Sequence, residues 1–161
     1  MSRIPRLLAA ALLTALLLAP GQSHAAAGLV PVKSGHSVKK TVKRLTSDLE
    51  KRGMTVFAVI DHADGAKRAG LELPPTTVVL FGNPGAGTPL MQCARTMAID
   101  LPQKMLVFSG PSEFGQGHGQ TWIVYNDPDY LARRHGITGC GESLRKIEEA
   151  LAGFARRAAG E

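Results

Sequence analysis

The chain has 161 residues, of which 44% are hydrophobic, 5% aromatic and 20% charged, and its formal net charge is +6. The basic residues are scattered along the chain as pairs and are not clustered with aromatic residues, which argues against a nucleic-acid-binding surface. A chain of this length and hydrophobic content is expected to form one domain with its own core.

The segment 1–27 has the layout of a secretory signal peptide. Two arginines precede an apolar run at 7–19, which is shorter than the roughly 20 residues that a membrane span needs. A proline and a glycine end the run and small residues follow, so we expect cleavage near Ala25–Ala27. An uncleaved membrane anchor is the alternative. We favour a periplasmic or secreted protein with no stable membrane anchor and no nucleic-acid partner.

The mature chain, residues 28–161, keeps a mild charge and both cysteines. Loss of the two leader arginines lowers Lys and Arg from 19 to 17 against 13 Asp and Glu, which leaves a net charge of +4. Cys93 and Cys140 are an isolated pair, and in an oxidising compartment such a pair favours one disulfide. The alternatives are a metal-binding pair and a reactive thiol, although neither cysteine has another cysteine or a histidine within four positions.

The mature chain begins with a short apolar run at 28–34, which predicts a strand. Apolar residues then recur at spacings of three and four between Val38 and Leu49, which predicts an amphipathic helix ended by Gly53. The segment 54–61 is β-branched and apolar, so it predicts a second strand in a central position of the sheet.

The remaining expected elements are a short helix within 62–75, a strand at 76–82, a helix from Thr88–Pro89, two antiparallel strands at 103–110 and 120–127, and helices at 127–136 and 141–159. This order predicts an α+β fold, a two-layer sandwich of a single mainly antiparallel sheet with helices packed on one face. The connection Ser109–Gln120 is long for a hairpin. It either covers a site or is a tolerated surface insertion, and we favour the insertion.

The stretch FGNPGAGTPLM, from Phe81 to Met91, has glycines at the spacing of a nucleotide-binding P-loop. Thr88 stands at the lysine position of that motif and Pro89 at the Ser/Thr position, so both groups that hold phosphate and magnesium are missing. The stretch therefore predicts a β-turn followed by a helix with Thr88 as N-cap and Pro89 as first residue. The free N–H groups of that helix could still bind a small anion, and we favour plain turn chemistry.

Three blocks of sequence together resemble the bacterial domain of unknown function 302 family. They are IDHADGAKRAGLELPPTTVVLFGNPGAGTPLMQ at 60–92, IDLPQKMLVF at 99–108 and YNDPDYLARRHGI at 125–137. The resemblance covers nearly all of the mature chain. It implies a compact α+β domain, often exported or fused to other modules and commonly homodimeric, with no established catalytic activity. The segments around both cysteines are similar to members with a paired cysteine, which supports the disulfide.

The polar side chains that could form a site if these blocks meet are Asp61, His62, Asn83, Thr88, Tyr125, Asn126, Asp127 and His135. His62 with Asp61 could act as an acid/base pair or a metal ligand, or His62 could cap a turn, which we favour. Asn126 and Asp127 are typical of a strand end and a helix cap, and His135 of a cation at a helix C-terminus. The mature histidines have no HxH or HxxxH spacing, so no metal or cofactor is expected.

The favoured function is that of an exported, dimeric, non-catalytic module that binds a small molecule or anion or acts as an accessory domain. The first alternative is an enzyme that uses Asp61 and His62 as acid/base, with Asn83 or Asn126 as polarising groups. The second is metal handling through His62 or His135.

Overall fold

The computed structural model describes residues 28–110 and 119–161. Its five strands are β1 (Leu29–Ser34), β2 (Thr55–Asp61), β3 (Thr76–Gly82), β4 (Gln103–Ser109) and β5 (Thr121–Asn126). They form one sheet in the order β1-β5-β4-β3-β2, and every neighbouring pair is antiparallel. The predicted signal peptide and most of the long connection between β4 and β5 lie outside the described residues.

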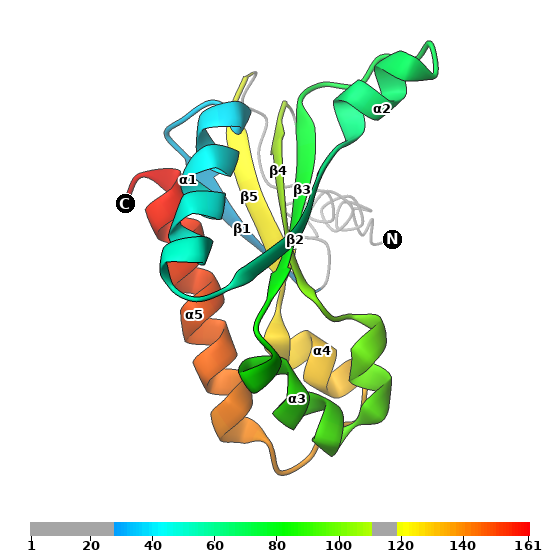
Figure 1. Cartoon of the computed structure of the whole chain (residues 1–161), viewed down its shortest axis with the longest axis vertical. Coiled ribbons are helices and arrows are strands. Elements are labelled where there is room, and N and C mark those ends of the chain that lie inside the picture. Colours follow the sequence, from blue (N-terminus) through cyan, green and yellow to red (C-terminus); the bar gives the residue numbers. More distant parts are fainter. Residues whose placement is uncertain (1–27, 111–118) are drawn as a thin grey trace, which may run out of the picture.

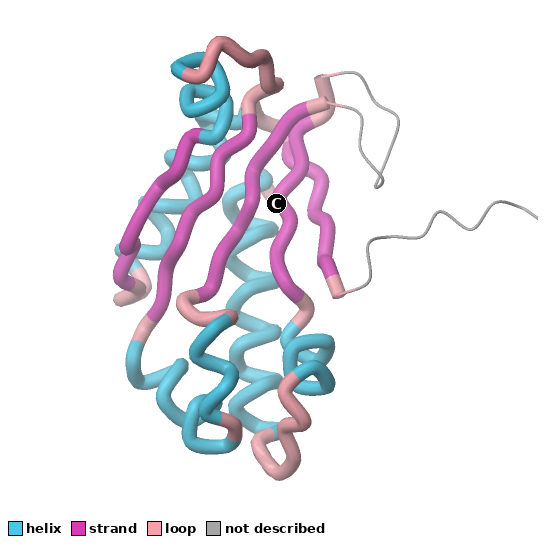
Figure 2. The backbone as a smooth tube through the Cα atoms, turned by 90° about the vertical axis from the view of Figure 1, so that its right-hand side faces the viewer, coloured by secondary structure: helices cyan, strands magenta, loops and turns pink. Residues whose placement is uncertain are grey.

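The helices are α1 (Val38–Lys51), α2 (His62–Arg68), α3 (Pro84–Cys93), the 3-10 helix η1 (Arg95–Ile99), α4 (Pro128–Arg134) and α5 (Gly141–Ala159). Figure 1 shows α1 and α5 side by side along the sheet, α3 and α4 at its lower end, and α2 projecting from its upper end. In Figure 2 the strands stand in front and the helices behind them. The predicted α+β sandwich with a single antiparallel sheet is confirmed.

The two long helices form where their apolar stripes predict them. Ser37 caps α1 by accepting a hydrogen bond from the N–H of Lys40, and Leu45 and Leu49 on that helix are fully buried. At the far end of α5, Arg157 donates to Asp48 of α1 at 2.8 Å. These contacts hold α1 against α5, so both helices cover the same face of the sheet.

Alternate side chains of the central strands build the core beneath these helices. Val79, Met105 and Ile123 are completely buried on the helix-covered face. The rings of Phe81 and Phe154 meet edge-to-face with their centroids 6.0 Å apart. Contacts of this kind between a strand and α5 anchor the C-terminal half of α5 to the sheet.

Two expectations about the elements are wrong. The strand 54–61 was expected in a central position, but β2 pairs only with β3 and forms an edge of the sheet. The helix expected from Thr88 begins one turn earlier, at Pro84, with Asn83 as its N-cap and Pro89 inside it. Asn83–Pro84 and Thr88–Pro89 each combine an N-cap residue with a proline at the first helical position. The helix starts at the earlier pair, where hydrogen bonds to Gly53 and Gly85 hold the Asn83 side chain.

Among the residues that the structure describes, no helix combines the length and the hydropathy that crossing a bilayer requires.

Candidate functional site

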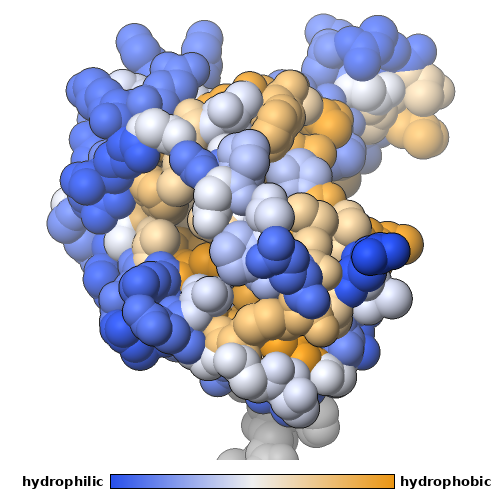
Figure 3. Space-filling model, turned by 60° about the horizontal axis from the view of Figure 1, so that its bottom comes forward, coloured by the Kyte–Doolittle hydropathy of each residue, from blue (hydrophilic) through white to orange (hydrophobic). Residues whose placement is uncertain are grey.

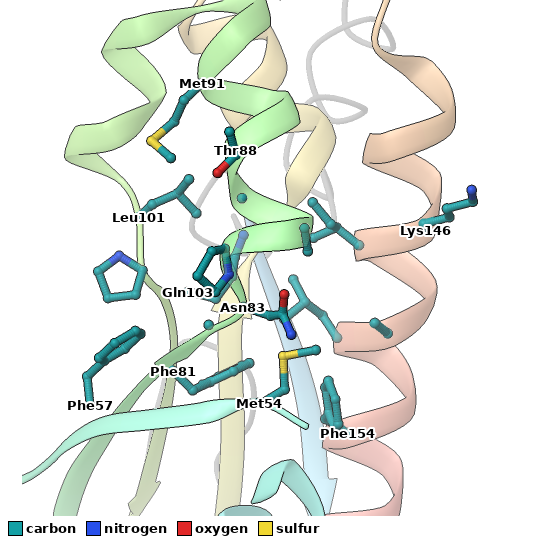
Figure 4. Close-up of a pocket in the computed structure, with 18 of the residues that line it drawn as sticks. Met54, Phe57, Phe81, Asn83, Thr88, Met91, Leu101, Gln103, Lys146 and Phe154 are labelled. Atoms are coloured by element: carbon teal, nitrogen blue, oxygen red, sulfur yellow. The ribbon is translucent and has the colours of Figure 1, made fainter. Parts of the chain in front are cut away.

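An apolar pocket of about 590 Å³ opens between the lower end of the sheet, α3 and α5. Figure 3 shows apolar surface gathered around a hollow on this lower face, with hydrophilic residues along one side of it. The large apolar side chains that line the pocket include Met54, Phe57, Phe81, Met91, Leu101 and Phe154. Figure 4 shows Met91 and Leu101 on one side of the pocket and Met54, Phe81 and Phe154 on the other.

The local sequence explains why this space stays open. The wall that α3 contributes carries Ala86 and Gly87, whose small side chains leave room towards α5. A Cβ atom added at Gly82 would already touch the Phe57 ring at 3.4 Å, so a larger residue there would crowd that ring. The GNPGAG stretch therefore forms part of the pocket wall with mostly small side chains.

The polar groups of the pocket differ in how they are bonded. Both ends of the Asn83 amide are hydrogen-bonded within the protein. Its Nδ2 donates to the carbonyl of Gly53 at 3.1 Å, and its Oδ1 accepts from the N–H of Gly85 at 2.8 Å. The Gln103 amide and the Thr88 hydroxyl make no hydrogen bond to any described residue, although both line the pocket. These two groups are therefore available to a ligand.

No charge in the described part of the pocket points into it. Lys146 lies on the rim, but its Nζ pairs with Glu142 at 2.7 Å, and Figure 4 shows that Nζ directed away from the other lining residues. The first-turn N–H groups of α3 are also occupied, since those of Ala86 and Gly87 both donate to the carbonyl of Asn83. The glycine stretch therefore forms the capped first turn of α3 where a β-turn was predicted. The lack of an inward charge in the described part of the pocket suits an uncharged ligand.

The predicted site residues separate into groups at the two ends of the sheet. Asp61 lies opposite Thr77, at the upper end of β2, where its Oδ1 accepts from the N–H of Asp64 at 3.0 Å. His62 follows as the exposed first residue of α2. Asn83 follows the other end of β3. The seven-residue strand β2 spans about 20 Å, so Asp61 and His62 do not meet Asn83.

The remaining predicted residues lie at the lower end of the sheet or in the core. Asn126 ends β5 opposite Leu29, and Asp127 caps α4 by accepting from the N–H of Asp129 at 2.9 Å. Tyr125 is buried in the core, and this burial raises the pKa of its hydroxyl. Asn126 therefore lies far from His62, and the convergence on which the enzyme hypothesis depends is absent from the described structure.

His135 belongs to a cluster of polar side chains that the sequence patterns did not reveal. Its Nε2 lies 2.6 Å from Asp100 Oδ2 and its Nδ1 3.0 Å from Thr96 Oγ1, while Arg134 reaches the other Asp100 oxygen at 3.4 Å. The cluster ties η1 to the end of α4. Asp100 and His135 both stand in the blocks that carry the family resemblance, at IDLP and RHG, and this is the one signal that could have paired them.

This cluster has a structural role and leaves neither imidazole nitrogen of His135 free to bind a ligand. Both imidazole nitrogens of His135 already have partners, and its side chain is 6% exposed. Within residues 28–110 and 119–161, no group of three or more His, Cys, Asp or Glu side chains is arranged to hold a metal ion. In the described structure, neither His62 nor His135 therefore belongs to such a group.

The predicted disulfide is present. Cys93 and Cys140 are bonded, with their Cα atoms 6.6 Å apart and 47 positions between them in sequence. Cys93 is the last residue of α3 and Cys140 is the N-cap of α5. The bond therefore joins the two helices that form facing walls of the pocket.

Part of this chain is similar to part of two fluoride-specific ion channels. The fluoride-specific ion channels FluC 1 of Brucella suis biovar 1 (strain 1330) and FluC 2 of Brucella melitensis biotype 1 are each 46% identical to it over 110 residues, which is 68% of this chain and 41% and 38% of theirs. The chain thus spans about two fifths of the length of these curated relatives.

The crystal structure of an uncharacterized conserved DUF302 protein from Bacillus stearothermophilus has the same fold, with a TM-score of 0.71 at 21% identity. The superposition covers 83% of this chain and 99% of that one. A family model described as domain of unknown function DUF302 matches residues 30–154. This range contains the whole sheet except Leu29, and it ends at Phe154 within α5. The chain therefore belongs to the DUF302 family.

Proposed function

We propose that this protein is a non-catalytic binding domain for a small, uncharged and mainly apolar molecule, and that the pocket between α3 and α5 is its site. The observation that carries the proposal is the pocket itself. Its volume of about 590 Å³ lies within the range of roughly 300–1,000 Å³ typical of small-molecule sites. Its lining combines aromatic and thioether side chains with very few polar groups, as such sites do.

The side chains that line the pocket indicate which class of ligand it can hold. Phe57 is 57% exposed and offers its ring to a flat or aromatic molecule, while the nearly buried Phe81 and Phe154 lie behind the pocket surface. Gln103 can donate and accept a hydrogen bond, and Thr88 can do the same. A ligand with one carbonyl or hydroxyl group would satisfy these side chains without bringing a charge into an apolar space, which would be costly.

The proposal includes a place of action outside the cytoplasm. The leader at 1–27 and the disulfide between Cys93 and Cys140 both support it, because disulfides persist in oxidising compartments. Cleavage near Ala25–Ala27 would release the domain without its apolar leader. N-terminal sequencing of the protein recovered from the periplasm tests this part, and recovery of the uncleaved chain in the membrane fraction would contradict it.

Binding can be tested with the neutral fluorescent dye Nile red and its displacement by small aromatic alcohols and ketones. The variant Ala86→Phe fills the pocket from its α3 wall, whereas Ala69→Phe places the same exposed ring beside α2, far from the pocket. We expect the wild type and Ala69→Phe to bind the dye and Ala86→Phe to lose most of this binding. Equal binding by all three proteins, or none by the wild type, would reject the pocket as the site.

A further inference from the structure

A second pocket lies at the other end of the sheet, where β2 and β4 end, β3 and β5 begin, and α1 starts. This is the upper end in Figure 1, from which α2 projects. The pocket has a volume of about 670 Å³, a size typical of small-molecule sites. No described residue lines both this pocket and the apolar one between α3 and α5. We call it the polar pocket, because its described lining includes Lys39, Asp61, Thr77, Ser109 and Thr121.

The strand register brings these polar side chains together. Asp61 lies directly opposite Thr77, and Ser109 lies opposite Thr121. Cross-strand partners share a face of the sheet, as do residues two positions apart in one strand. Val107 is the partner of Thr77 on β4, stands two positions before Ser109 and is buried in the core beneath the helices. All four polar side chains therefore belong to the helix-covered face, at the end where the apolar core stops.

The two threonines of the polar pocket are buried but have unsatisfied hydroxyl groups. Thr77 is 8% exposed and Thr121 is 4% exposed. Neither hydroxyl makes a hydrogen bond to another described residue, whereas the hydroxyl of the neighbouring Thr41 lies 2.8 Å from Ser34 Oγ. A buried hydroxyl without a partner costs free energy. The pocket that both threonines line is the space from which a bound molecule can supply that partner.

The described lining of the polar pocket carries one charge of each sign. Lys39 and Asp61 form no ion pair with another described residue. Asp61 Oδ1 accepts from the N–H of Asp64 at 3.0 Å, and this bond leaves Oδ2 free to accept another. Ser37 and Val38, at the start of α1, also line the pocket. The first N–H groups of a helix have no partner within it and favour negative charge, so the α1 side suits a carboxylate and the Asp61 side an ammonium group.

We propose that the polar pocket binds a small zwitterion of the α-amino-acid class, as a free amino acid or a dipeptide. Its carboxylate lies against Lys39 and the start of α1, its ammonium group against Asp61, and its other polar atoms bond to Thr77 and Thr121. The apolar part of the ligand contacts the apolar side chains of the lining, which are Val38, Val42, Val59, Ala63 and Pro75. This site is separate from the apolar pocket and does not depend on the function proposed for it.

NMR titration of the ¹⁵N-labelled, oxidised chain tests the ligand class. The probes are the twenty common amino acids and dialanine at millimolar concentration. We expect at least one of them to bind, and to bind about 10-fold or more tightly than its N-acetyl derivative, which lacks the ammonium group, and its amide derivative, which lacks the carboxylate. This factor is the value of one hydrogen bond to a charged group. Binding of none of the probes, or equal binding of the blocked derivatives, would overturn the proposal.

Variants of the two charged residues test the orientation of the ligand. Asp61→Asn keeps an N-cap residue at the start of α2, and it should abolish the preference for the ligand over its N-acetyl derivative. Lys39→Gln should instead abolish the preference over the amide derivative. Asp64→Asn and Lys43→Gln are the matched controls, since neither residue lines the polar pocket, and both should bind like the wild type. Preferences that survive in both pocket variants, or that are lost equally in the controls, would reject this site.

Thr77→Val tests the unpaired hydroxyl, because it removes that group and keeps the shape of the side chain. It should weaken ligand binding by about 3- to 10-fold without lowering the urea midpoint of unfolding. Thr41→Val is the matched control, since it leaves Ser34 Oγ without its partner and should lower the urea midpoint but keep the ligand affinity. Unchanged ligand affinity in Thr77→Val would reject the polar pocket as the site. Nile red binding reports the separate apolar pocket and should be equal in all these variants, so failure of one proposal can be told from failure of the other.

Discussion

Cys93 and Cys140 fasten the end of α3 to the start of α5, and these two helices are facing walls of the apolar pocket. Leu90 of α3 and Leu144 of α5 belong to the same buried apolar cluster, so the two helices also pack together near the bond. The disulfide adds a covalent restraint to that packing at one end of the pocket.

The double variant Cys93→Ser/Cys140→Ser should lower the free energy of unfolding by about 3–4 kcal/mol, because a closed loop of this length restricts the unfolded chain. It should also weaken Nile red binding, since the end of α3 is then held against α5 by apolar packing alone. Urea unfolding and dye titration measure the two effects. The wild type treated with a reductant is the control and should behave like the double variant. Unchanged dye affinity would show that the disulfide does not set the pocket walls.

The Asp100–His135 pair predicts a second stability effect at the same end of the sheet. Asp100→Ala should lower the free energy of unfolding by about 1–3 kcal/mol, because it leaves a buried imidazole nitrogen without its partner. Glu149→Ala is the control, since its pair with Arg145 is exposed on α5 and such pairs contribute about 0–1 kcal/mol. Urea unfolding of both variants compares them. Equal effects would mean that the Asp100 cluster does not fasten η1 to α4.

Much of the fold could be predicted from local sequence patterns, because amphipathic helices and β-branched strands can be recognised from a short stretch of residues. The stripe from Val38 to Leu49 predicted α1 within two residues of its observed end. Strand order is a different matter, since β2 has the composition of a central strand yet lies at the edge. Its apolar Phe57, Val59 and Ile60 suggested a buried strand, but all three side chains are exposed at the edge of the sheet.

The site was harder to predict, since its members are far apart in sequence. Phe57 and Phe154 line the same pocket although they lie far apart in the sequence. No sequence motif with a fixed spacing links them. Asn83 and Thr88 were singled out and do border this pocket. Asp61 and His62 were singled out as well, but which end of the sheet a strand terminus occupies depends on pairing, which a single sequence does not show. Gln103 was missed because a lone glutamine at a strand start carries no recognisable motif.

The ion pairs of Asp48 predict how stability depends on pH. Burial would raise the pKa of this carboxyl, but hydrogen bonds from Arg157 and Arg52 outweigh it and hold the pKa below the ordinary value of 3.8. A depressed pKa in the folded state means that the pair stabilises the protein above the unfolded-state value. This contribution is lost as the pH falls through the folded value.

Asp48→Asn should therefore lower stability at neutral pH by up to about 1 kcal/mol, since the carboxyl is partly exposed and screened. The difference between variant and wild type should shrink as the solution is acidified below the ordinary carboxyl value. Thermal unfolding from neutral pH down to pH 3 or below measures this difference. A difference that stays constant over that range would show that the pair of Asp48 with Arg157 is not responsible.

Gln103 provides the sharpest test of how the pocket selects its ligand. Naphthalene and 2-naphthol have nearly the same shape, but only 2-naphthol can bond to the Gln103 amide. The wild type should prefer 2-naphthol by about 5- to 10-fold, the value of one additional hydrogen bond. Gln103→Leu should remove this preference and leave the affinity for naphthalene nearly unchanged, because the leucine keeps the volume of the side chain.

Thr88→Val is the matched control, as it deletes the other unbonded polar group of the pocket. If Gln103→Leu keeps the full preference and Thr88→Val loses it, the ligand's polar group lies at the α3 wall; if neither variant changes it, the bound molecules are not in this pocket.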